Sequence, residues 1–148
     1  MKTLPTAAED SAILALLEEW TELLACEKYE EALALLPPDP EQQWTPALLA
    51  SAVYGYGCPG YTREEAARVF GRADYKVTSL RGSPCRERIL RSVDICRFTP
   101  KTCPETLGMV RYFNIPLNGE MSDLTGIFYL RKLSETSMTL EFHDLHVM

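Results

Sequence analysis

The sequence predicts an α+β fold, in which N-terminal helices pack on one face of a curved antiparallel β-meander. Two observations predict this fold. Apolar residues recur at helical spacing in the first part of the chain, and they alternate as in strands in the last third. Helices and strands that are segregated in this way favour helices covering one face of an antiparallel sheet. A meander of about four main strands curls under its own twist, so we expect a cone-like sheet.

The last third of the chain predicts three consecutive strands. Their expected ranges are Met109–Leu117, Asp123–Leu133 and Met138–Val147. Asn118-Gly119 separates the first two, and both residue types tolerate the positive φ of a tight hairpin turn. The middle strand is apolar on both alternating sets of positions, which indicates a central strand that is covered, at least in part, on both faces.

The final strand contains an irregularity. Apolar residues occupy alternate positions as far as Phe142, and then Leu145 and Val147 continue the alternation one residue out of step. One inserted residue restores the pattern. We therefore predict a β-bulge near His143-Asp144.

Helical periodicity and capping residues predict four helices ahead of the sheet. Their expected ranges are about 10–26, 28–36, 46–54 and 63–70. Thr45-Pro46 is typical of a helix start, and the T-x-x-E sequence beginning at Thr62 is a capping box. Residues 74–80 are expected to form a short strand and residues 86–98 a long one, whereas residues 1–8 are expected to be a loose tail.

The length of 148 residues predicts a single domain over 1–148. The net charge of -6 is unevenly distributed: residues 1–65 contain 12 acidic and 3 basic residues, whereas residues 66–111 contain 10 basic and 4 acidic ones. Either the two segments complement one another, or the acidic segment is a docking surface for a partner with a basic surface. Nucleic acid is not favoured as a partner, because the basic residues come singly and form no known binding motif.

The five cysteines have no CxxC spacing, which favours free thiols in a reducing compartment. No apolar run is long enough to span a bilayer, and the N-terminus lacks the apolar core of a signal peptide. We therefore expect a cytoplasmic protein without membrane contact. No residue pattern predicts a metal site or a cofactor.

The order of elements resembles the NTF2-like (cystatin-like) superfamily. The resemblance is carried by the paired helices of LLEEWTELLACEKYEEALALL, followed by a curved antiparallel meander. The ending DLTGIFYLRKLSETSMTLEFHDLHVM is similar to small uncharacterised bacterial domains of that type, with Asp123-Leu124-Thr125 and Asp144-Leu145-His146-Val147 as its specific text. The resemblance implies a cone with a pocket between sheet and helices. It implies no single activity, because members include isomerases, dehydratases and binding modules.

Asp94 is one candidate for chemistry, because it lies within an apolar segment. A carboxylate that faced a pocket there could act as a general base, whereas the alternative is an ion pair with a neighbouring-strand arginine such as Arg111. Tyr112 and Asn114 share one alternating set of positions on the next strand and are candidates for ligand binding.

Asp144 and His146 are further catalytic candidates, together with the nearby His143. Two histidines three residues apart with a carboxylate between them can share a proton or bind zinc. On a regular strand the two histidines point to opposite faces, so only the predicted bulge could bring them together. The alternative is that these residues simply end the strand at the surface.

The segment Gly55–Tyr61 (GYGCPGY) is rich in glycine but lacks the lysine and the preceding strand of a phosphate-binding loop. Two interpretations are open for it, an ordinary connector and a lid over a pocket.

These observations favour a non-enzymatic bacterial domain that binds a protein partner or a small ligand, for instance an immunity or accessory protein whose acidic helices cover a basic partner. The alternative is an isomerase- or dehydratase-type enzyme that uses a pocket carboxylate as its acid or base. We also expect a homodimer formed through the outer face of the sheet.

Overall fold

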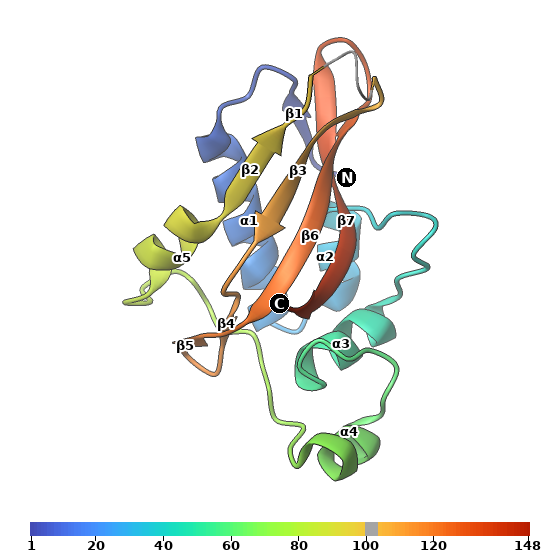
Figure 1. Cartoon of the computed structure of the whole chain (residues 1–148), viewed down its shortest axis with the longest axis vertical. Helices are drawn as coiled ribbons and strands as arrows, with labels where there is room; N and C mark the ends of the chain where they lie inside the picture. The colour runs from blue at the N-terminus through green and yellow to red at the C-terminus, as the bar shows by residue number, and fades with distance from the viewer. Residues whose placement is uncertain (100–103) are drawn as a thin grey trace.

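The structure is a computed structural model and describes residues 1–99 and 104–148. Within these residues the strands of the main sheet are β1 (Thr3–Pro5), β2 (Asp94–Arg97), β3 (Thr106–Tyr112), β6 (Leu124–Lys132) and β7 (Ser137–Val147). They form one antiparallel sheet in the order β1-β7-β6-β3-β2, which curls as predicted (Figure 1). A separate hairpin contains β4 (Pro116–Leu117) and β5 (Glu120–Met121).

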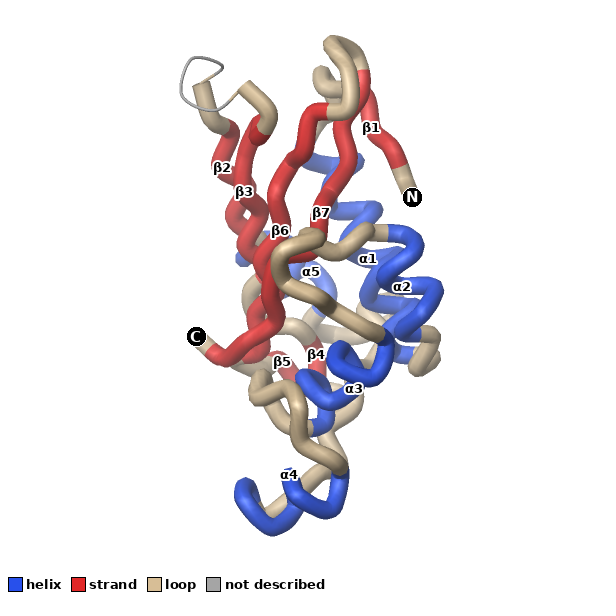
Figure 2. Tube along the Cα trace, turned by 90° about the vertical axis from the view of Figure 1, so that its right-hand side faces the viewer, coloured by secondary structure: helices blue, strands red, loops and turns tan. Residues whose placement is uncertain are grey.

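The helices of the described chain are α1 (Asp10–Ala25), α2 (Tyr29–Leu35), α3 (Pro46–Tyr54), α4 (Arg63–Phe70) and α5 (Arg86–Ser92). Figure 2 shows α1 and α2 on one face of the sheet, while α3 and α4 extend beyond the end at which the β4–β5 hairpin lies. No helix of the described residues covers the opposite face. None of these helices is long and apolar enough to cross a membrane. The α+β architecture therefore agrees with the sequence-based prediction.

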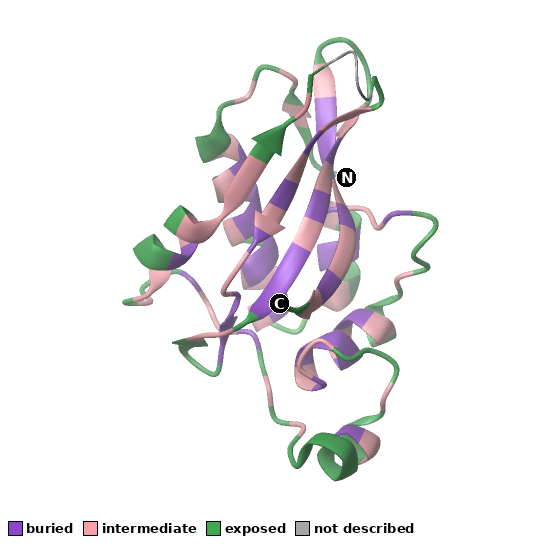
Figure 3. Ribbon diagram, viewed as in Figure 1, coloured by how far each residue is buried: buried purple, intermediate pink, exposed green. Residues whose placement is uncertain are grey.

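The apolar stripe of α1 is buried against the sheet, as the periodicity predicted (Figure 3). At its centre, Trp20 is fully buried, with its ring 5.1 Å from that of Phe128 and 5.6 Å from that of Phe142. The three aromatic rings fill the space between α1 and the sheet. The helix begins at Asp10, and the side chain of the preceding residue, Glu9, makes no capping hydrogen bond.

The capping signals placed α3 and α4 correctly. Thr45 Oγ1 accepts a hydrogen bond from the backbone N–H of Leu48 at 3.1 Å, and Pro46 is the first residue of α3. Thr62 Oγ1 accepts from the N–H of Glu65 at 3.1 Å, which confirms the capping box of α4.

The Asn118-Gly119 turn is confirmed. Both residues have positive φ, 52° and 83°, and they join β4 to β5 directly. The expected strand Met109–Leu117 is nevertheless interrupted. Asn114 has a φ of 62°, which turns the chain out of the main sheet between β3 and β4.

The predicted β-bulge is present in β7. Ile127 of β6 lies opposite Asp144, and the next residue of β6, Phe128, lies opposite Phe142. His143 is therefore the extra residue, and it restores the alternation that the sequence shifts at this point.

Two expected strands were wrong. Residues 86–98 form α5 and then the short β2, because Ile89 and Val93 are four residues apart, a spacing that suits a helix as well as a strand. Residues 74–80 form no strand, and Val77 makes only an isolated bridge to Leu117. This segment instead follows the β4–β5 hairpin through single backbone hydrogen bonds.

The expectation of a loose tail over residues 1–8 was also wrong. Thr3–Pro5 form β1, which pairs with residues 137–139 of β7. Thr139 Oγ1 donates to the carbonyl oxygen of Lys2 at 2.9 Å and fixes the start of the chain. The pairing covers part of the otherwise open edge of β7.

We predict that Gly57→Ala destabilises the protein more than Gly60→Ala does. Both substitutions place alanine at positive φ, 83° and 96°, which costs about 1 kcal/mol. Only at Gly57 would the new Cβ lie 2.8 Å from the backbone nitrogen of Val147, so its total loss should be roughly 2 kcal/mol or more. Urea denaturation measures both losses. Equal losses would contradict the close contact between this segment and the end of β7.

Candidate functional site

The bulge of β7 divides the histidine candidates into two separate pairs. His146 Nδ1 lies 2.8 Å from Asp144 Oδ2, whereas His143 Nδ1 lies 3.2 Å from Asp39 Oδ2. A carboxylate at Nδ1 orients an imidazole so that Nε2 can exchange a proton. The imidazole side chains of His143 and His146 are 28% and 33% exposed; Asp144 is part-exposed as well, whereas Asp39 is buried. Among the described residues, no three His, Cys, Asp or Glu side chains are arranged to hold a metal ion.

Asp39 belongs to a strap, residues 37–44, that the sequence did not link to the bulge. Its N–H donates to the carbonyl oxygen of Phe142 at 2.8 Å, and Trp44 Nε1 donates to that of His143 at 2.9 Å. The N–H of Glu41 donates to Asp39 Oδ1 at 3.0 Å. This hydrogen bond, with a smaller contribution from His143, lowers the pKa of the Asp39 carboxyl. The strap is therefore held to β7 by a carboxylate that favours its charged form.

Asp94 makes the ion pair that was the alternative to a pocket position. Arg111 lies directly opposite on β3, and its Nε and Nη2 lie 3.0 and 2.5 Å from Asp94 Oδ2. The Asp94 side chain is 42% exposed. Its charge is therefore balanced at the surface of the sheet.

Tyr112 and Asn114, the two ligand-binding candidates, have different partners. Tyr112 is fully buried beneath α1, and its hydroxyl lies 2.8 Å from Thr21 Oγ1, which itself donates to the carbonyl of Leu17. Burial raises the pKa of the Tyr112 phenol. Asn114 Nδ2 donates to Ser92 Oγ at 3.1 Å, at the end of α5. Tyr112 is thus part of the core and is closed off from solvent.

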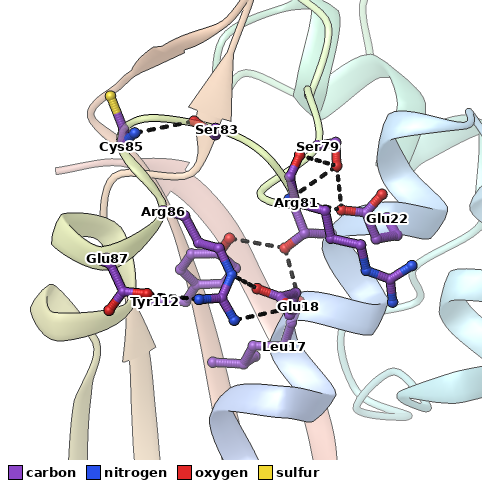
Figure 4. Close-up of polar contacts among 11 residues, drawn as sticks. Leu17, Glu18, Glu22, Ser79, Arg81, Ser83, Cys85, Arg86, Glu87 and Tyr112 are labelled. Atoms are coloured by element: carbon purple, nitrogen blue, oxygen red, sulfur yellow. Dashed lines mark hydrogen bonds and ion pairs between the residues drawn. The ribbon is translucent and has the colours of Figure 1, made fainter.

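Polar contacts join α1 to the segment that leads into α5 and to the start of that helix (Figure 4). Arg86 donates to both oxygens of Glu18, from Nε at 2.6 Å and from Nη2 at 3.2 Å. Glu22 accepts from the loop before α5, and Arg97 pairs with Asp10 at 2.9 Å. These contacts join part of the acidic segment to the basic one, so the two segments complement one another in part.

A hollow of about 430 Å³ lies where three segments meet beyond the end of the sheet. Tyr56 enters it from the segment after α3, and Arg72 and Tyr75 enter it from the segment after α4. The remaining wall consists of residues 117, 118 and 120–123, in and behind the β4–β5 hairpin. Four other hollows on the described surface hold 260 to 370 Å³ each. We call the largest of these five the tyrosine pocket and take it as the candidate site.

The backbone at the end of α3 directs Tyr56 into this pocket. The N–H of Tyr56 bonds to the carbonyl of Val53 and that of Gly57 to the carbonyl of Ala52, which is the Schellman pattern of helix termination. Tyr56 takes the left-handed position of the pattern, with a φ of 50°, where glycine is usual. Its ring stacks on Tyr75, with centroids 4.8 Å apart and planes at 20°. A strained backbone therefore holds an aromatic ring in the pocket wall.

Some charged side chains around the pocket form an ion pair, and others do not. Arg72 donates to Asp74 from Nε and Nη2, at 2.6 and 2.9 Å, and lies over the ring of Tyr75 at 4.4 Å. Hydrogen bonds from Arg72 lower the pKa of the Asp74 carboxyl. The carboxylates of Glu120 and Asp123 have no hydrogen-bond or ion-pair partner among the described residues, and both residues are exposed. The pocket wall thus contains two unpaired negative charges.

Only part of this pocket could be found from the sequence. Gly55–Tyr61 was open to interpretation as a lid over a pocket, and Tyr56 from this segment does line one. Arg72, Tyr75, Glu120 and Asp123 were missed. They come from segments that are distant along the chain and carry no motif.

Comparison with known proteins gives no assignment. No family model, no curated protein and no solved structure matches the chain. The structure describes four cysteines, and all four are free thiols; Cys103 lies outside the described residues.

We predict that Asp39→Asn loosens the strap in a pH-dependent manner. A lowered pKa means that the carboxylate stabilises the fold at pH values above its ordinary pKa, and that this stabilisation is lost as the pH falls through the lowered value. At pH 7 the variant should lose about 1 kcal/mol of unfolding free energy, and the difference from wild type should shrink below about pH 4. Chemical denaturation between pH 3 and 8 measures this difference. A difference that stays constant with pH would contradict the role of the charge.

Proposed function

We propose that the chain is a non-enzymatic binding domain and that the tyrosine pocket is its binding site. One observation carries the proposal: unpaired polar groups and a stacked tyrosine pair face this hollow. The space between α1 and the sheet, where the NTF2-like resemblance implies a pocket, is filled by Trp20, Phe128 and Phe142. Membership of that superfamily remains part of the proposal, supported by helices that precede a curved antiparallel sheet. An immunity or accessory role would fit such a domain.

The geometry gives less support to an isomerase- or dehydratase-type enzyme. Such an enzyme needs an acid or base facing a closed chamber that excludes water. Asp94 and Asp144 are each paired at the surface, with exposed side-chain fractions of 42% and 41%. His146 is likewise part-exposed, and its Nε2 lies 3.0 Å from Met148 Sδ.

The substitution Tyr56→Gly tests the proposed site. Glycine suits the left-handed backbone of residue 56, so the turn should keep its conformation while the pocket loses one ring. A library of neutral aromatic and polar fragments is titrated into ¹⁵N-labelled protein. We expect shifts that cluster at Tyr56, Tyr75 and residues 117–123 in the wild type and are lost in the variant.

Tyr61→Ala is the matched control. Tyr61 comes from the same segment but packs on Phe70 and lines two other hollows. Its replacement should leave fragment binding at the tyrosine pocket unchanged. The proposal fails if no fragment binds the wild-type pocket, or if Tyr56→Gly binds fragments as well as the wild type does.

A second candidate function is docking of a protein with a basic surface on α1 and α2. It is favoured by Glu19, Glu30 and Glu31, which are exposed and have no ion-pair partner among the described residues. The two helices lie side by side on one face of the sheet (Figure 2). Carboxylates that remain unpaired can steer a basic partner toward this surface.

Neutralising these three carboxylates tests the docking surface. The variant Glu19→Gln/Glu30→Gln/Glu31→Gln should lose a protein that the wild type captures from its native cells, because the attraction is mainly electrostatic. Affinity capture with mass spectrometry at low and high salt measures the loss. The control Glu41→Gln/Glu64→Gln/Glu105→Gln removes three exposed carboxylates elsewhere and should keep the partner. Equal capture by both variants would exclude this surface.

A further inference from the structure

We infer that the tyrosine pocket binds a cation, namely a guanidinium or ammonium group on a short chain. The inference rests on the proposed function, since it takes the pocket as the binding site, and it adds the charge and shape of the ligand. Three observations support it: the unpaired carboxylates, the neutralised arginine and the stacked tyrosine rings.

The balance of charge in the pocket wall is negative. Glu120 and Asp123 are exposed carboxylates without a hydrogen-bond or ion-pair partner in the part of the chain that the structure describes. Arg72 is the positive side chain of the same wall, but Asp74 accepts two hydrogen bonds from it. Within the described residues, these two negative charges form no ion pair with a cation of the chain. Hydrogen bonds from a cationic donor to a carboxylate are stronger than those between neutral groups.

The aromatic wall already binds a guanidinium group of the chain itself. Arg72 lies over the face of Tyr75 with its Cζ 4.4 Å from the ring centre, and Tyr75 stacks on Tyr56. Cations are attracted to the electron-rich face of a phenol ring. The two tyrosine rings and the two carboxylates line the same hollow.

The surrounding charges argue against an anionic ligand in this hollow. The exposed Arg88 and Arg91 border a separate hollow, which shares only Met121 with the tyrosine pocket. An anion would be attracted to these arginines outside the pocket and repelled by the carboxylates of Glu120 and Asp123 inside it. The volume of about 430 Å³ is large enough for a group the size of an amino-acid side chain.

The experiment compares a charged probe with its neutral isostere. N-acetyl-arginine methylamide and the corresponding citrulline derivative have nearly the same shape, but only the first carries a charge. In NMR titrations of the ¹⁵N-labelled full chain, we expect the arginine probe to shift Tyr56, Tyr75 and residues 117–123. The citrulline probe should bind at least about fivefold more weakly, because it lacks the charge that the carboxylates and rings recognise.

Single substitutions in the pocket wall identify the groups that bind the cation. Glu120→Gln and Asp123→Asn should each weaken the arginine probe by about three- to fivefold, the usual range for part-exposed ion pairs. Glu105→Gln is the control, since this exposed carboxylate directly precedes β3, whose other end leads to the β4–β5 hairpin. It should leave the affinity unchanged.

The cation could be a free small molecule or a side chain of a protein partner. Agmatine and an arginine flanked by glycine and serine in a seven-residue peptide distinguish these sources. Tighter binding of agmatine supports a small-molecule ligand, and tighter binding of the peptide supports a protein side chain. Both results support a cation site.

Other outcomes overturn the inference. Equal affinity for the arginine and citrulline probes, or tighter binding of N-acetylglutamate, would show that the pocket does not select a cation. If neutral fragments bind the wild-type pocket while every cationic probe fails, the inference is wrong and the proposed function stands. If nothing binds in the pocket, both are wrong.

Discussion

The extra residue in β7 is the constraint on which the rest of the structure depends. Phe142 and Leu145 are three residues apart, so on a regular strand they would face opposite sides of the sheet. With His143 inserted between them, both are buried against the helices. A bulge also increases the local twist, which favours a sheet that curls around Trp20. Beyond the bulge, the end of β7 meets Gly57 closely, so the segment carrying Tyr56 is placed by the same irregularity.

The conformation of Tyr56 sets a backbone cost against an aromatic contact. Gly55 and Gly57 flank it, yet the tyrosine takes the left-handed position at the end of α3. That conformation costs about 1 kcal/mol for a residue with a side chain. Stacking on Tyr75 contributes about 0.5–1.5 kcal/mol, so the two effects nearly cancel. The stacking therefore offsets the backbone cost and holds the ring in the wall of the tyrosine pocket.

Features set by neighbouring residues could be predicted from the sequence, whereas those set by distant contacts could not. The caps at Thr45 and Thr62, the Asn118-Gly119 turn and the bulge near His143 depend on a few consecutive residues, and all are present. Helix α5 was mistaken for a strand because apolar residues four apart suit either structure. The partner of His143 is 104 residues away, and the tyrosine pocket joins three separate segments, so no local pattern signals either of them.

Paired and unpaired carboxylates occupy different parts of this fold. The carboxylates near the histidines and Arg111 are already hydrogen-bonded: Asp94 and Asp144 are part-exposed on the sheet, and Asp39 is buried in the strap beside β7. A proton-transfer site would need such groups to face a substrate in a closed space. Glu120 and Asp123 are the reverse case, since they are unpaired and lie beside aromatic rings in a hollow. A cation would be attracted both to these unpaired carboxylates and to the faces of the aromatic rings, which is the physical basis of the cation site that we propose.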